Sequence, residues 1–85
     1  GEELRRPRWT VTTEIGPRSE RPVFFRETGG TVSTRIFDRE SLAVDQAVRG
    51  PAIIEEWSST ILVPPQWVAH TDQEGNLVLI RQERP

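Results

Sequence analysis

The segment that most constrains the fold is GPAIIEEWSSTILVPP, at residues 50–65. It consists of an apolar stretch, a short polar turn, and a second apolar stretch that ends at two prolines. Short apolar stretches bounded by turn residues are typical of β-strands, and two of them joined by a polar turn predict a hairpin. Pro64 and Pro65 cannot donate hydrogen bonds to a neighbouring strand, so the second strand must end there or lie at a sheet edge.

The same signals recur along the chain. Residues 9–15 alternate apolar and polar side chains with the period of two that a half-buried strand shows. Gly29 and Gly30 can supply the positive φ angles of a tight turn and predict a second hairpin. Further strands are predicted at residues 22–27, 31–37, 52–56, 60–63, 67–71 and 76–81.

The connections between these strands are predicted from their polarity and their weak periodicity. Residues 18–21 are polar and are predicted to form a loop. Residues 38–48 have only a weak helical spacing of apolar side chains, so we expect an irregular connection with a short turn. The chain is therefore predicted to be all-β, with about six or seven mostly antiparallel strands in a small barrel or a two-layer sandwich.

Composition limits how stable such a domain can be by itself. A chain of 85 residues, of which 34% are hydrophobic, has a thin core. A small domain buries only about 60% of the surface that its unfolded chain exposes. The chain has no cysteine, so disulfide bonds and thiolate metal sites are excluded. Contact with another protein surface is the remaining source of stabilisation.

The strand predicted at residues 76–81 offers such a surface. It contains four consecutive apolar residues, Leu77, Val78, Leu79 and Ile80. Because successive side chains on a strand point to opposite faces, a core this small cannot hold all four. We expect either Leu77 with Leu79 or Val78 with Ile80 to stay at least partly exposed and to be covered by a neighbouring domain.

Composition also excludes several functions. The formal net charge is −2 and the basic residues are dispersed, which gives no electrostatic footprint for nucleic acid. All 11 basic residues are Arg, so a Schiff-base lysine and the lysine of a phosphate-binding loop are excluded. No apolar run approaches the roughly 20 residues of a membrane span, and no signal peptide is visible, so we expect a cytoplasmic protein.

A catalytic triad is the first chemistry to weigh. His70 is the only imidazole, and Ser58, Ser59 and Asp72 are the residues that could complete a hydrolase triad with it. Neither serine lies in the Gly-x-Ser-x-Gly context that exposes a nucleophile on a sharp turn. We expect the two serines to form a turn between strands and His70 to lie on the polar face of a strand.

The acidic residues also favour structural roles. Glu55 and Glu56 are adjacent, so on a strand their carboxylates point to opposite faces. We expect one of them to be solvated and the other to bond an Arg. Asp38, Asp45 and Asp72 are too dispersed to indicate a metal site.

The glycines and tryptophans complete the candidates. Gly29 and Gly30 lead into a strand pattern, whereas phosphate-binding glycine loops lead into a helix N-terminus. Trp9, Trp57 and Trp67 could stack on sugars or bases, but we expect them to supply core or inter-domain contact area. The sequence therefore assigns no catalytic, cofactor-binding or metal-binding residue.

Four stretches in a fixed order carry a resemblance to a known family: PVFF, IFDRESL, GPAIIEEWSSTILVPP and EGNLVLI, over about residues 22–80. They resemble the C-terminal domain of the hydantoinase/oxoprolinase family, which includes N-methylhydantoinase A, 5-oxoprolinase and acetone carboxylase subunits. Two departures concern local turn shapes. Gln66 follows the paired prolines where the family usually has Gly, and Val44 and Asp45 stand where it usually has Pro-Gly.

Residues 1–8 are charged and contain a proline, so we expect a flexible lead or linker remnant. The resemblance implies that residues 9–85 are the C-terminal β domain of a larger cytoplasmic enzyme. That enzyme would use ATP and a divalent metal to open a cyclic amide or to carboxylate a ketone. Because its nucleotide site would lie upstream, this fragment would hold no cofactor and no catalytic residue. It would pack on the catalytic domains and on a second subunit.

Two alternatives stay open. One is a free-standing β binding module whose tryptophans and residues 77–80 form a ligand or peptide groove. The other is a small independent hydrolase.

Overall fold

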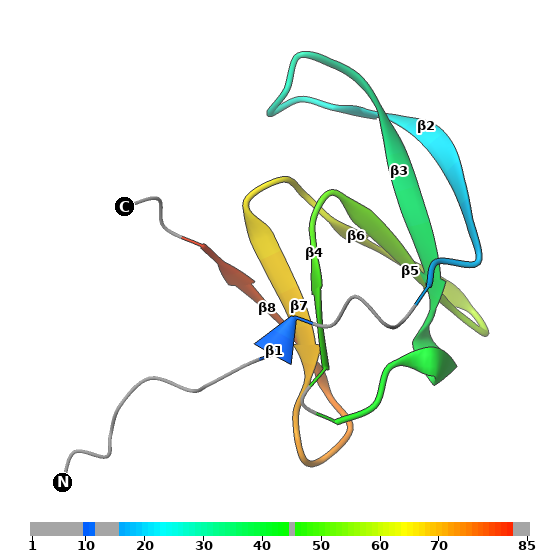
Figure 1. The fold of residues 1–85 in the computed structure, drawn as a ribbon, viewed down its shortest axis with the longest axis vertical. Helices are drawn as coiled ribbons and strands as arrows, with labels where there is room; N and C mark the ends of the chain where they lie inside the picture. Colours follow the sequence, from blue (N-terminus) through cyan, green and yellow to red (C-terminus); the bar gives the residue numbers. More distant parts are fainter. Residues whose placement is uncertain (1–9, 12–15, 45, 83–85) are drawn as a thin grey trace, which may run out of the picture.

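Two four-stranded β-sheets form the domain within residues 10–11, 16–44 and 46–82, which the computed structural model describes (Figure 1). One sheet has the order β1-β4-β7-β8, with β1 at Thr10–Val11, β4 at Gln46–Arg49, β7 at Trp67–Thr71 and β8 at Leu77–Arg81. The other has the order β2-β3-β5-β6, with β2 at Ser19–Phe25, β3 at Gly30–Asp38, β5 at Ala52–Glu56 and β6 at Ser59–Val63. A 3-10 turn, η2 at Arg39–Ser41, lies between β3 and β4.

Side chains from both sheets pack into one core. The buried cluster consists of Phe37, Leu42, Val48, Ala52, Ile54, Val63 and Ala69. Because these residues come from strands of different sheets, the sheets face each other as a two-layer sandwich. The predicted all-β class is confirmed. Of the two predicted architectures the sandwich is the one observed, because the sheets do not close into a barrel.

The β5–β6 hairpin forms the centre of this core. In its antiparallel register Ala52 lies opposite Val63 and Ile54 lies opposite Ile61. Ala52, Ile54 and Val63 are fully buried, because alternate residues of a strand share one face. The apolar stretches of the segment at residues 50–65 therefore form the predicted hairpin.

Most neighbouring strands run antiparallel, as predicted. The exceptions within the described residues are β1 with β4 and β3 with β5, which pair in parallel. β3 and β5 can run parallel because the chain leaves their sheet between them, forming η2 and then β4 in the other sheet. No helix in the described part of the chain is long and apolar enough to cross a membrane.

Gly50 lies where the chain passes from β4 in one sheet to β5 in the other. A Cβ atom at Gly50 would lie 1.9 Å from the Pro64 carbonyl oxygen and 2.6 Å from the Val63 carbonyl oxygen. The Gly50 N–H donates a hydrogen bond to the Trp67 carbonyl oxygen at 2.8 Å. Close approach of the two backbones therefore requires glycine at the first position of the segment.

Gln66 adopts a left-handed backbone conformation, with a φ of 75°. Glycine adopts this conformation without steric cost, whereas other residues adopt it rarely. The Gln66 carbonyl oxygen accepts a hydrogen bond from the Gln82 N–H at 2.7 Å, which helps to hold the turn. The turn after the paired prolines thus has a glycine-type shape, although this chain has Gln there.

Two segments differ from the sequence prediction. β2 begins at Ser19, inside the segment predicted to be a loop, because Ser19 pairs with Ile36 at the far end of β3. Residues 46–49 form β4, which begins inside the segment predicted to be irregular, because they pair with β7. In both places the backbone finds partners distant in the sequence, which local polarity does not reveal.

Part of the prediction falls outside the described residues. The expected lead at residues 1–8 lies there, and so does most of the strand expected at residues 9–15, of which Thr10–Val11 is β1.

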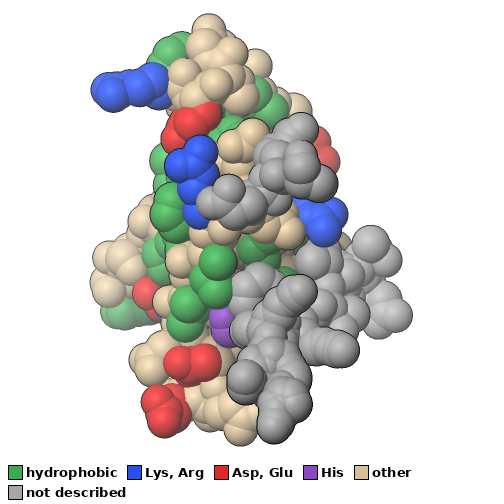
Figure 2. Space-filling view, turned by 90° about the vertical axis from the view of Figure 1, so that its left-hand side faces the viewer, with side chains coloured by type: hydrophobic (Ala, Val, Ile, Leu, Met, Phe, Trp, Pro, Cys, Tyr) green, Lys and Arg blue, Asp and Glu red, His purple; other side chains and the backbone are tan. Residues whose placement is uncertain are grey.

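The edge strand β8 shows the predicted partial exposure. Leu77, Val78, Leu79 and Ile80 are all half-buried. Leu77 and Leu79 pack against the core cluster, so Val78 and Ile80 face the other way. Figure 2 views the molecule from the side of β8 and shows hydrophobic side chains at the surface between charged ones. The prediction that one pair stays partly exposed is confirmed.

Candidate functional site

A groove of about 610 Å³ lies where the residue before β2, the end of β3, η2 and the end of β5 come together. Its lining is mostly charged and consists of Arg18, Asp38, Arg39, Glu40, Glu55, Glu56 and Trp57. These residues are distant in the sequence, and strand pairing brings them together.

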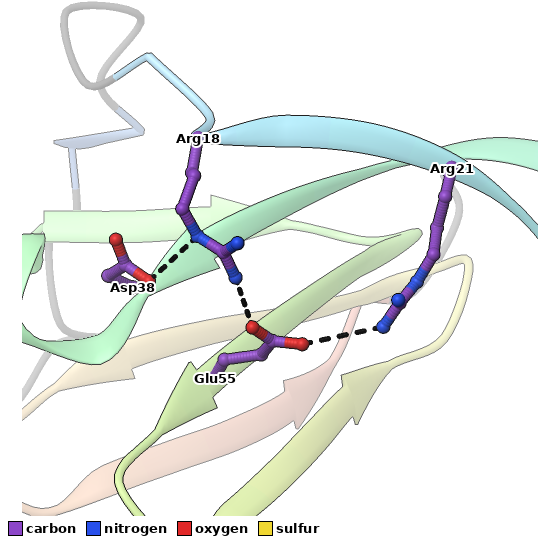
Figure 3. A network of polar contacts seen from close by, with 4 residues as sticks. All are labelled: Arg18, Arg21, Asp38 and Glu55. Atoms are coloured by element: carbon purple, nitrogen blue, oxygen red, sulfur yellow. Dashed lines mark hydrogen bonds and ion pairs between the residues drawn. The ribbon is translucent and has the colours of Figure 1, made fainter.

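Arg18 joins two of the groove carboxylates, Asp38 and Glu55 (Figure 3). Its Nε atom lies 3.0 Å from Asp38 Oδ1, and its Nη2 atom also bonds Glu55 Oε1. Arg21 Nη2 approaches the other oxygen of Glu55 at 3.4 Å.

The register of the sheet explains why this arginine is needed. In the parallel pair β3–β5, Asp38 is the Cα partner of Glu55, so two carboxylates lie side by side. Like charges in such a position repel each other and destabilise the sheet. Arg18 neutralises that repulsion, and its backbone N–H is held by the Ile36 carbonyl oxygen at 2.7 Å.

A second groove arginine, Arg39, pairs with Glu56. Arg39 Nη1 lies 3.1 Å from Glu56 Oε1, and Arg39 Nη2 donates a hydrogen bond to the Gly75 carbonyl oxygen at 2.6 Å. The Ser59 hydroxyl donates to Glu56 Oε2 at 3.1 Å. Arg39 thus links η2 both to β5 and to the β7–β8 turn of the other sheet.

The sequence prediction for the two adjacent glutamates is half right. Glu55 and Glu56 bond different arginines although both line the same groove, and an Arg bonds to one of them as expected. The expectation that the other is only solvated is wrong, because each carboxylate has its own Arg partners. The ion pairs depend on strand register, which the sequence prediction did not include, and on η2, a short turn within the connection predicted at residues 38–48.

Asp72 is a turn-forming residue. Its Oδ1 atom accepts the Asn76 backbone N–H at 2.8 Å and the Glu74 backbone N–H at 2.9 Å. The pKa of Asp72 is lowered, mainly by the hydrogen bond from the Asn76 backbone N–H. Desolvation opposes this shift. The Glu74 backbone N–H, the Asn76 side-chain amide and the coulombic interaction with His70 lower the pKa further. These bonds close the turn between β7 and β8.

The possible triad residues lie in different elements of the structure. Ser58 and Ser59 lie at the β5–β6 turn, and the Ser59 hydroxyl donates a hydrogen bond to Glu56. His70 lies in β7 of the other sheet, half-buried and opposite Ala47, rather than on a polar face. The Asp72 carboxylate accepts the backbone hydrogen bonds that close the β7–β8 turn.

The remaining candidates also take structural places. Gly29, with a φ of 73°, forms the predicted hairpin turn, in which the Thr28 hydroxyl donates to the Phe25 carbonyl oxygen at 3.1 Å. Within the described residues no group of three or more His, Cys, Asp or Glu side chains could hold a metal ion. Asp45 and Trp9 lie outside those residues.

The tryptophans diverge in role. Trp67 is half-buried and packs against the core cluster, as expected. Trp57, at the turn after β5, is 98% exposed and borders the groove. Sequence reasoning did not identify the groove arginines, Arg18 and Arg39. The acid-Arg-acid run at Asp38, Arg39 and Glu40 was the one local signal for them.

Residues 7–81 match the hydantoinase/oxoprolinase C-terminal domain. The chain belongs to this family. The resemblance predicted from the sequence is thereby confirmed, and hydantoinase/oxoprolinase proteins are also found among its individual relatives.

Two of those relatives have named activities. The chain is 34% identical over 63 residues to caprolactamase subunit alpha of Pseudomonas jessenii, an overlap that covers 74% of this chain and 9% of that protein. It is 33% identical over 74 residues to 5-oxoprolinase 1 of Arabidopsis thaliana, covering 87% of this chain and 6% of that protein. An uncharacterized protein of Methanocaldococcus jannaschii is 38% identical over 65 residues, covering 76% and 9% respectively. The chain thus spans less than a tenth of the length of these relatives.

A solved structure shares the fold. The nucleotide-free structure of acetone carboxylase, from work on ATP-dependent acetone carboxylation, superposes with a TM-score of 0.74 at 22% sequence identity. The match covers 91% of this chain and 11% of the acetone carboxylase chain. The two-sheet sandwich therefore also occurs as a small part of a much longer chain.

Proposed function

We propose that this chain is a non-catalytic C-terminal domain of a larger ATP-dependent enzyme of the hydantoinase/oxoprolinase type. The observation that carries the proposal is the family match over residues 7–81, together with relatives of which the chain spans less than a tenth. Such an enzyme opens a cyclic amide or carboxylates a ketone, and its ATP and divalent metal bind in the remainder of the polypeptide. In this proposal residues 9–85 are the domain, residues 1–8 are the lead into it, and the enzyme is cytoplasmic.

The chemistry of the groove supports a structural role. Arginines form ion pairs with Asp38, Glu55 and Glu56. The Ser59 hydroxyl donates a hydrogen bond to Glu56. The chain contains no Lys and no Cys, which removes two of the common nucleophiles of covalent catalysis. What the groove residues do is join β3, β5 and η2 and tie η2 to the opposite sheet.

The partner in this proposal is the catalytic body of the same polypeptide, with a second subunit beside it. A subunit partner is supported by one relative, which is named as the alpha subunit of caprolactamase. The half-buried Val78 and Ile80 of β8 are one surface that such a body could cover.

An activity assay tests the non-catalytic role. The purified chain is incubated with ATP and Mg²⁺ and, in separate reactions, with hydantoin, 5-oxoproline, caprolactam, or acetone with bicarbonate. Phosphate release should equal the protein-free blank in every reaction, while the full-length parent should release phosphate with at least one substrate. Phosphate release that co-purifies with the isolated chain through successive columns would overturn the proposal.

The alternative is a free-standing β binding module, and the exposed Trp57 beside the groove is the observation that favours it. The length of the reading frame that encodes this domain distinguishes the two proposals. A reading frame that continues upstream for several hundred residues with phosphate-binding motifs supports the enzyme domain, and a reading frame confined to this domain supports the module.

A further inference from the structure

Trp57 is the most exposed large hydrophobic residue in the described part of the chain. It lies at the turn between β5 and β6 and 98% of its surface is accessible. A two-residue turn does not require an aromatic side chain, since small and polar residues form turns readily. Tryptophan brings about 150–250 Å² of surface to an interface when it is buried. The Trp57 side chain therefore buries almost no surface in the isolated domain, but it could bury a large apolar area in an interface.

The groove beside Trp57 has a surplus of negative charge. Its lining contains four carboxylates, Asp38, Glu40, Glu55 and Glu56, against two guanidinium groups, Arg18 and Arg39. Arg21 also approaches Glu55 from outside the lining, which leaves one negative charge in excess. Glu40 is exposed and makes no ion pair with a described residue, unlike the other three carboxylates. The groove thus combines an exposed indole with a carboxylate that forms no ion pair with the described residues.

We propose that Trp57 and this groove form the surface by which the domain docks on the rest of its parent polypeptide, and that they receive an Arg or Lys side chain from it. The cation would lie over the indole face and pair with Glu40, an arrangement in which a cation–π contact and a charge-assisted hydrogen bond act together. Tryptophan and arginine are also the residues that most often dominate the free energy of protein interfaces.

The remainder of the parent is the occupant that the observations favour. The relatives are more than ten times longer than the aligned segment, so most of the surface available to cover Trp57 belongs to the remainder. The groove's negative charge selects a basic patch within that surface. This inference rests on the proposed function, because it names the contact through which the domain joins the enzyme.

The test is a titration of the 85-residue chain into the parent polypeptide that lacks it, with the dissociation constant measured by calorimetry at low and high salt. Trp57→Ala should raise the dissociation constant at least tenfold. Glu40→Gln should raise it less and should make it less sensitive to salt, because one ionic contact is lost. Each variant should melt within about 4 °C of the wild type, as expected for exposed positions.

Phe24→Ala is the matched control. Phe24 is also a large exposed side chain, at 64%, and it lies on the other hairpin of the same sheet, β2–β3, away from the β5–β6 turn (Figure 1). Its removal should leave the dissociation constant within about twofold of the wild type.

The outcomes separate this inference from the proposed function. Wild-type binding that neither Trp57→Ala nor Glu40→Gln weakens would overturn this surface and leave the proposed function standing. No binding of the wild-type chain to the remainder would overturn both. A dimer of the chain that Trp57→Ala dissociates in sedimentation experiments would show that a second copy is the occupant, and would overturn the inference as well.

Discussion

Replacing Gln66 by Gly should stabilise the domain. Gln66 has a φ of 75° and an exposed side chain, so the substitution relieves backbone strain without removing a buried contact. Left-handed backbone costs a non-glycine residue about 1–2 kcal/mol. Glycine makes the unfolded chain more flexible, which takes back about 0.5–1 kcal/mol. The net gain should be about 0.5–1 kcal/mol, or about 2–8 °C in melting temperature for a domain of this size.

Urea unfolding followed by tryptophan fluorescence measures this gain, because the neighbouring Trp67 is half-buried against the core. Two controls separate strain from side-chain effects. Gln66→Ala removes the side chain but keeps the strain, and should change the stability little. Gln73→Gly lies in the β7–β8 turn at an exposed position without a positive φ, and should destabilise by about 0.5 kcal/mol. If Gln66→Gly destabilises the domain as much as Gln73→Gly does, the reasoning from left-handed strain is wrong.

Three further predictions follow from the packing and the turns. Gly50→Ala should destabilise by about 3 kcal/mol or more in urea unfolding, because its Cβ would lie 1.9 Å from a backbone oxygen that no rotamer can move; a loss below about 1 kcal/mol would contradict this. The pKa of Asp72 is lowered from 3.8, so its stabilising effect is present above that pH and is lost as the pH falls through the folded-state pKa. Asp72→Asn should therefore destabilise more at pH 7 than at pH 2, and an equal loss at both would refute the electrostatic cause. Replacing Val78 and Ile80 together by Thr should cost the isolated domain about 0.5 kcal/mol per site but weaken assembly or activity of the full-length enzyme, and unchanged assembly and activity would show that this pair is not covered in the enzyme.

Local sequence patterns determined the strands and the tight turns. The apolar stretches at Ala52–Glu56 and Trp67–Thr71 form strands with the predicted bounds, because alternation of side chains and bounding turn residues are properties of a short stretch of chain. Gly29 likewise has the positive φ expected of it. The family could be recognised for the same reason, since its four stretches are local and keep their order.

Tertiary structure decided what those strands bring together. β4 is a strand because it pairs with β7 and β1, and Asp38 meets Glu55 because β3 and β5 pair in parallel. The groove with Arg18 and Arg39 follows from that register, and so does the exposure of Trp57, which composition alone assigned to a core or an interface. Sequence patterns specify how a segment of a few residues is shaped, whereas register and burial depend on segments far along the chain, whose pairing no local pattern encodes.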